Sequence, residues 1–220
     1  MTYILGARCK DGVVLISDSK VIRGTGYTHE EKIFLPFNEV VVGAAGLTGL
    51  FDKFLKQILI RTANRQVNFY DFVNTVEDVI REIVARYRER VGASEKGLLE
   101  ALIAIQTQPK SELYHVLENG YAEIVQGSLA IGHGEPYGSI FLKQLWNKDM
   151  TMLETAKLGA LIIKTIDDFG LDITVGGKPQ IRFIPDKEKI REPTEDESKE
   201  IATFSMKTLK ISEFFEELKK

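Results

Sequence analysis

The 220-residue chain has one cysteine, Cys9, so it cannot form an internal disulfide framework or a cysteine-rich metal site. Its three histidines lack the spacing that is typical of zinc sites. No stretch approaches the roughly 20 apolar residues that are needed to span a bilayer. The opening segment, MTYILGARCKDG, becomes charged too early for a secretory signal. We therefore expect a cytoplasmic protein without a membrane anchor, metal or organic cofactor, with Cys9 in the core.

The chain also lacks an excess of positive charge. Its net charge is −3 and both signs are interspersed, which argues against a nucleic-acid partner. At 44% hydrophobic residues, the chain is long enough to bury one sizeable core. We expect one domain over residues 1–185. Residues 186–220 are predicted to form a charged connection and a C-terminal helical extension of that domain, with helices near 194–207 and 211–218.

Hydrophobic periodicity predicts the order of the secondary-structure elements. Strands are expected at 2–9, 13–17, 26–28, 32–35, 39–45, 101–108, 112–118, 121–126, 129–132, 172–175 and 180–184. Helices are expected at 47–59, 70–91, 137–146 and 151–168, and the last of these is apolar on two sides, as in a helix buried between layers.

Strand runs that follow one another closely require antiparallel sheets, and helices that occur in pairs require outer layers. A four-layer α/β/β/α sandwich of the α+β class satisfies both requirements. Periodicity alone leaves other α+β folds open.

Thr2 carries a specific chemical possibility. Removal of Met1 leaves a hydroxyl and a free α-amine on the same residue. The amine has an ordinary pKa near 7.7–8.0, so a sizeable fraction is neutral at cellular pH and can accept the proton of the hydroxyl. Small second residues are common, however, and in most proteins a threonine at this position is an incidental strand residue.

Three sequence blocks place Thr2 in a wider pattern. They are TYILGARCKDGVVLISDSK at residues 2–20, VGAAGLTG at 42–49 and AIGHGEPY at 130–137. Over residues 2–184 the chain resembles the proteasome family, specifically its β-type subunits and their bacterial Anbu-like and HslV-like relatives. These proteins are N-terminal-nucleophile hydrolases, so the resemblance implies the four-layer sandwich and a nucleophilic threonine.

The resemblance implies roles for individual residues. Thr2 corresponds to the nucleophile. Asp18 would accept hydrogen bonds from the N-terminal region and pair with Lys32, whose ammonium would lower the pKa of the Thr2 hydroxyl. The alternative for Asp18 and Lys32 is an exposed surface pair. Gly46 corresponds to the backbone N–H donor of an oxyanion hole, and Ala44 to the base of the substrate pocket.

Two further positions are implied by the same resemblance. Asp172 stands where the family has a second active-site aspartate. His133 stands where the family has a serine beside the amine of the nucleophile. It can act as a proton shuttle or be a loop histidine with no catalytic role, and the sequence favours neither.

The predicted function is therefore a threonine endopeptidase acting on peptides or unfolded proteins. As a proteasome relative, it would form a homo-oligomer or ring, with possible proteasome-type partner subunits. Two alternatives stay open. One is a catalytically silent assembly or scaffold subunit that retains Met1, and the other is a transpeptidase or amidase on the same fold.

Overall fold

The computed structural model describes residues 2–63, 68–92 and 97–204. Its strands are β1 (Ile4–Cys9), β2 (Gly12–Ser17), β3 (Lys20–Arg23), β4 (Gly26–His29), β5 (Ile33–Phe37), β6 (Val40–Gly46), β7 (Leu99–Ile105), β8 (Glu112–Val116), β9 (Ala122–Ile124), β10 (Ser128–Ile131) and β11 (Gln180–Pro185). Its helices are α1 (Thr48–Thr62), α2 (Phe69–Val91), α3 (Glu135–Leu145), α4 (Met152–Asp168) and α5 (Glu195–Thr203).

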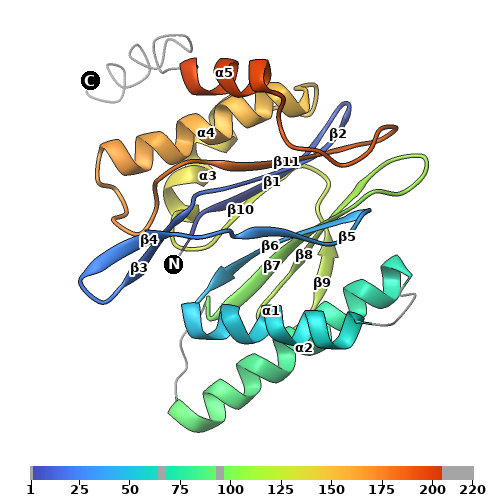
Figure 1. The fold of residues 1–220 in the computed structure, drawn as a ribbon, viewed down its shortest axis with the longest axis vertical. Coiled ribbons are helices and arrows are strands. Elements are labelled where there is room, and N and C mark those ends of the chain that lie inside the picture. Colours follow the sequence, from blue (N-terminus) through green and yellow to red (C-terminus); the bar gives the residue numbers. More distant parts are fainter. Residues whose placement is uncertain (1, 64–67, 93–96, 205–220) are drawn as a thin grey trace.

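The elements form four layers (Figure 1). An antiparallel sheet in the order β10-β1-β2-β11 faces a second antiparallel sheet in the order β5-β6-β7-β8-β9. Helices α3 and α4 cover the first sheet, and α1 and α2 cover the second. The predicted α/β/β/α sandwich is confirmed.

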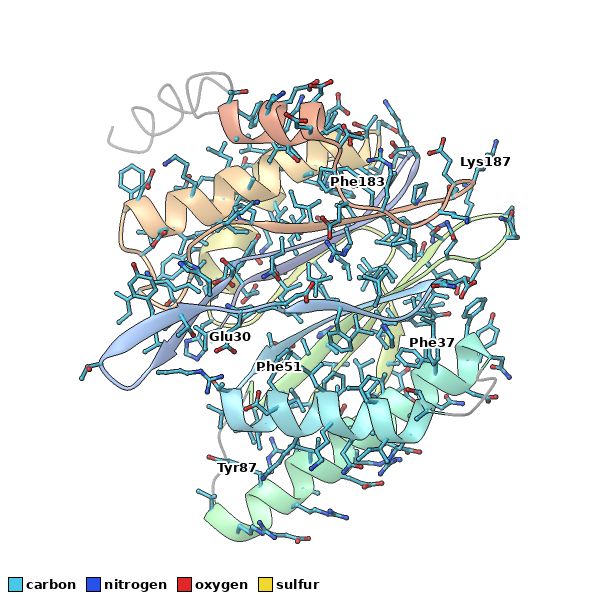
Figure 2. The ribbon with its side chains drawn as sticks, viewed as in Figure 1. Glu30, Phe37, Phe51, Tyr87, Phe183 and Lys187 are labelled. Atoms are coloured by element: carbon cyan, nitrogen blue, oxygen red, sulfur yellow. The ribbon has the colours of Figure 1, made fainter. Side chains whose placement is uncertain are left out.

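Each interface between layers has its own apolar core. One core joins α1 and α2 to the second sheet, a smaller one lies between the sheets, and the third joins α3 and α4 to the first sheet. Figure 2 labels Phe37 on β5 and Phe183 on β11, which belong to the two outer cores. Cys9 is buried in the third core, and burial raises the pKa of its thiol to about 12, so it behaves as an apolar residue.

Local signals explain where the helices begin and end. The Asn68 side chain accepts a hydrogen bond from the Asp71 backbone N–H, and Gly92 ends α2 with φ of +67°. Thr151 and Glu154 form a capping box at the start of α4. Helix α4 is buried along most of its length, as its apolar residues on two sides predicted, because it packs between the first sheet and α5. Among the described residues, no helix is long and apolar enough to cross a membrane.

Two local predictions differ from the structure. Residues 172–175 form a turn and not a strand, because the Asp172 side chain accepts hydrogen bonds from the backbone N–H and the hydroxyl of Thr174. The sequence also missed β3, which pairs with β4 as an isolated two-stranded hairpin.

The C-terminal extension is only partly described. Helix α5 covers residues 195–203 of the helix expected at 194–207, and the helix expected at 211–218 lies outside the described residues. Buried Ile201 joins the core under α4, and the Arg191 guanidinium binds the Glu197 carboxylate at 2.6 and 2.9 Å. The described part of the extension therefore packs against α4, and its place in one domain with residues 1–185 stays a prediction.

Candidate active site

Thr2 lies two residues before the start of β1, where the chain enters the first sheet, and it is 5% exposed. The backbone of the next residue, Tyr3, makes two hydrogen bonds with Asp18. Its backbone N–H donates to the Asp18 carboxylate at 2.9 Å, and its carbonyl accepts from the Asp18 N–H at 3.2 Å. Since Asp18 directly follows β2, the β1–β2 pairing fixes Thr2 beside this carboxylate.

Asp18 and Lys32 form a buried ion pair. The Lys32 Nζ lies 2.9 Å from each oxygen of the Asp18 carboxylate and 2.7 Å from the carbonyl of Lys20. Their side chains are 0% and 4% exposed, respectively. The contact expected from the sequence is therefore present, and the alternative of an exposed surface pair is excluded.

Backbone donors also surround the Asp18 carboxylate. The N–H groups of Lys20 and Gly176 each lie 3.2 Å from Oδ2. Burial raises the pKa of Asp18, while the charge of Lys32 and the hydrogen bonds from the Tyr3 and Gly176 N–H groups oppose the rise. Burial likewise lowers the pKa of Lys32, against the attraction of Asp18. Burial disfavours the charged form of each residue, so each buried charge needs the other as its partner.

A small pocket opens beside Thr2. It is lined by Thr2, Val21, Glu30, Glu31, Lys32, Ala44, Gly46, Thr48 and Phe51. Glu30, after β4, and Phe51, on α1, can be found in Figure 2 near the ends of these elements. The pocket thus brings together three of the predicted site residues, Thr2, Lys32 and Gly46, with Ala44, the predicted base of a substrate pocket.

Gly46 lies at the end of β6, where the chain turns toward α1, as the sequence predicted. Its φ is +152°, and a Cβ there would lie 2.3 Å from the carbonyl oxygen of Leu98. Glycine is therefore required for the backbone of β6 to approach β7 at the edge of the pocket.

His133 lies in the loop between β10 and α3, and its side chain is exposed. The glycines on either side contact Thr2. The Gly134 N–H lies 3.4 Å from the Thr2 carbonyl oxygen, and a Cβ on Gly132 would lie 2.3 Å from the same oxygen. The loop that carries His133 is therefore packed against the main chain of Thr2, while the part taken by the imidazole stays a prediction.

The side-chain hydrogen bonds of Asp172 are within its own turn. Its carboxylate accepts from the backbone and hydroxyl of Thr174 within its own turn, at 2.8 and 2.6 Å. That turn leads to Gly176, whose N–H reaches Asp18. The contacts of the described residues connect Asp172 to the site through this turn, and its proposed catalytic role stays a prediction.

Sequence analysis did not identify Asp167, which lies closer to the glycines of this turn. Its carboxylate lies 3.2 Å from the Lys20 Nζ and accepts from the Gly177 N–H at 3.3 Å. A Cβ on Gly176 would lie 2.4 Å from the Asp167 carboxylate. The Gly176-Gly177 pair was the available signal, because adjacent glycines often mark a close approach to the backbone.

The pocket also contains two acidic residues that the sequence did not single out. Glu30 binds the Arg23 guanidinium at 2.8 and 3.0 Å, and Glu31 lies 3.2 Å from the guanidinium of Arg182. Both sit in the short connection between β4 and β5. Across the described ranges, no group of three or more His, Cys, Asp or Glu residues is arranged to hold a metal ion.

A family model described as Proteasome subunit matches residues 2–175. The chain belongs to the proteasome subunit family. Proteasome subunit alpha proteins from two strains of Methanococcus maripaludis, C5 and S2, are 26% and 27% identical to it over 161 residues. Each of these matches covers 71% of this chain, which spans only 61% of the length of these curated relatives.

Solved structures support the same fold. The Anbu Gly-1 mutant from Hyphomicrobium sp. strain MC1 is similar with a TM-score of 0.75 and 18% identity, covering 98% of this chain and 97% of the other. Anbu from Yersinia bercovieri, described as an ancestral beta-subunit, has a TM-score of 0.71 and 18% identity, with 90% and 91% covered. Together with the family match, they confirm a proteasome-like N-terminal-nucleophile hydrolase family.

Proposed function

We propose that this chain is a threonine-type peptidase that cleaves peptide bonds through Thr2 after removal of Met1. The observation that supports this most directly is the buried Asp18–Lys32 pair: Asp18 binds the backbone beside Thr2, and Lys32 lines the same pocket as Thr2. A buried ion pair adds little net stability compared with an apolar pair of the same size. Its position beside a candidate nucleophile is better explained by chemistry than by packing.

The proposed reaction has two halves. The Thr2 Oγ attacks the scissile carbonyl carbon while its proton passes to the Thr2 α-amine. The peptide C–N bond then breaks, the leaving nitrogen takes that proton, and the acyl group stays on Oγ as an ester. Water attacks the ester, with the α-amine again accepting a proton, and release of the carboxylic acid restores the hydroxyl.

The surrounding groups would each assist one part of this sequence. The positive charge of Lys32 favours the ionised form of the Thr2 hydroxyl, and Asp18 holds Lys32 in place. The Gly46 N–H would stabilise the negative oxygen of the tetrahedral intermediate, and loss of one such donor typically costs about 2.7–4 kcal/mol of barrier. In this proposal His133 would move protons near the α-amine, and Asp172 would hold the turn that leads to Gly176.

The proposed substrates are peptides or unfolded proteins. Ala44 lies at the pocket with Val21 and Phe51, an arrangement that favours an apolar side chain next to the scissile bond. Because proteasome subunits work in oligomers, we propose that this chain forms a homo-oligomer or ring, with proteasome-type partner subunits possible.

The first test is the intact mass of the protein from its native source, followed by reaction with a peptide epoxyketone. This probe has two electrophilic carbons, which can bond to the hydroxyl and the amine of one residue. We expect loss of one methionine and a single adduct that maps to Thr2. Thr2→Ser should still react, and Thr2→Ala should not.

The same experiment separates the alternatives. Retention of Met1 in native protein, with no adduct, would refute the peptidase and favour the silent scaffold subunit. An adduct on Thr2 combined with acyl transfer to added peptide amines in preference to water would favour the transpeptidase or amidase.

A further inference from the structure

The side chain of Glu100, on β7, connects the two sheets near the proposed nucleophile. It lies opposite Ala45 in the β6–β7 register, beside the Gly46–Leu99 pair. Its Oε1 accepts a hydrogen bond of 3.2 Å from the Gly132 N–H, which follows β10 of the other sheet. The carboxylate therefore joins the sheet that carries Gly46 to the loop that follows the strand paired with β1.

Gly132 transmits that contact to Thr2. Its φ is +89°, and a Cβ there would lie 2.3 Å from the Thr2 carbonyl oxygen and 3.1 Å from the Ala45 side chain. The loop thus fits between Thr2 on one sheet and Ala45 on the other. A shift of Gly132 would change the distance between Thr2 and Gly46, the two groups that must act on the same carbonyl.

The Glu100 carboxylate is itself held by a buried histidine. The His115 Nε2 lies 3.0 Å from Glu100 Oε2, and its Nδ1 lies 3.4 Å from the carboxylate of Glu123. His115 is on β8, is 7% exposed, and pairs with Leu102, so its ring occupies the gap between the sheets. A half-buried carboxylate fixed in this way has little freedom to turn away from the Gly132 N–H.

We propose that Glu100 is a positioning residue for the Thr2 reaction, and that His115 holds it in place. Glu100 acts through Gly132 and sets the separation between the nucleophile and the oxyanion donor. The inference rests on the proposed function, because only a reaction at Thr2 gives this separation a consequence.

The test compares two substitutions at Glu100 in the full chain. Glu100→Ala removes both hydrogen bonds, whereas Glu100→Gln keeps an acceptor for Gly132 and an amide that can pair with neutral His115. We measure the maximal rate of Thr2 modification by the peptide epoxyketone (kinact) and the concentration at half-maximal rate (KI). Glu100→Ala should lower kinact by about tenfold or more with KI nearly unchanged, since a displacement of about 1 Å can cost about 100-fold. Glu100→Gln should restore most of kinact.

Glu77 provides the matched control. It is also a half-buried glutamate whose carboxylate accepts a backbone N–H, that of Ala122, at 2.7 Å, but it lies on α2 in the outer helical layer. Glu77→Ala should lose thermal stability to an extent similar to Glu100→Ala while retaining kinact. His115→Gln should lower kinact by less than Glu100→Ala.

The outcomes distinguish this inference from the proposed function. If the chain without substitutions does not react with the epoxyketone at Thr2, the proposed function fails. If it reacts and Glu100→Ala keeps its kinact, the positioning role is wrong while the function stands. The role is equally wrong if kinact falls in Glu77→Ala as much as in Glu100→Ala, because the effect would then follow stability.

Discussion

Replacement of Lys32 by methionine tests whether the Asp18–Lys32 pair is the buried, charged contact that the proposed chemistry needs. Methionine has a similar length and no charge, so Lys32→Met removes the ammonium and leaves the Asp18 carboxylate 0% exposed without its cation. Breaking a buried pair by removing one partner typically costs about 3–5 kcal/mol of unfolding free energy. In a chain of this length, that corresponds to a fall of about 6–20 °C in the thermal midpoint.

The assay is chemical denaturation of the purified protein, with the epoxyketone reaction measured in parallel. Lys20→Met is the control, because the Lys20 Nζ lies 3.2 Å from the Asp167 carboxylate in a more exposed pair. Exposed pairs of that kind contribute about 0–1 kcal/mol to the free energy of unfolding. Lys32→Met should therefore be destabilised several times more than Lys20→Met, and its reaction at Thr2 should be strongly reduced.

A double variant separates the charge from the rest of the contact. Asp18→Asn in the Lys32→Met background removes the unpaired buried charge, so the double variant should be less destabilised than the sum of the two single variants. It should still fail to react at Thr2, since the ammonium is absent. A Lys32→Met protein within about 1 kcal/mol of the unmodified chain would refute the reasoning, because a change that small is typical of an exposed pair.

Three further predictions address other parts of the site and the C-terminal extension. Gly132→Ala should lower both the thermal midpoint and the epoxyketone reaction, because the new Cβ would lie 2.3 Å from the Thr2 carbonyl oxygen at a φ of +89°; normal reaction of this variant would contradict the close packing. Ala44→Leu should fill the pocket beside Thr2, so that probes with a bulky apolar side chain react more slowly while an alanine-based probe is little affected; equal slowing of both probes would argue against a side-chain pocket. The Arg191 guanidinium lowers the pKa of Glu197 from its ordinary 4.5 to about 2, so this carboxylate contributes stability above pH 4.5 that is lost as the pH falls toward 2. The difference in thermal midpoint between the unmodified chain and Glu197→Gln should therefore be largest near pH 7 and shrink below pH 4.5, and a difference independent of pH would contradict this.

Much of the fold could be predicted because the pattern of apolar residues matched the layers that bury them. Helix α4 is an example, since its apolar residues on two sides predicted burial between two layers. The segment 172–175 was predicted wrongly for an identifiable reason. The alternation of Ile173 and Val175 resembles a strand, but Ile173 is 71% exposed and the Asp172 side chain stabilises a turn instead.

Site residues could be predicted only where they come directly after a predicted strand or match a family pattern. Asp18 comes directly after a predicted strand, and its contact with Lys32 was expected from the family resemblance. Glu100 and Asp167 were not identified, because the contact of Glu100 with Gly132 and that of Asp167 with Lys20 join residues 32 and 147 positions apart in sequence. Those contacts depend on how the two sheets stack and how the turn after α4 folds back, and neither follows from local periodicity.

The Asp18 carboxylate draws its donors from distant parts of the chain. Tyr3 and Lys32 are 15 and 14 residues away, but Gly176 is separated from it by 158 residues. A growing polypeptide therefore cannot complete this centre until residue 176 has been synthesised. In the proposed peptidase, the centre beside Thr2 therefore stays incomplete until this late segment has folded back onto Asp18.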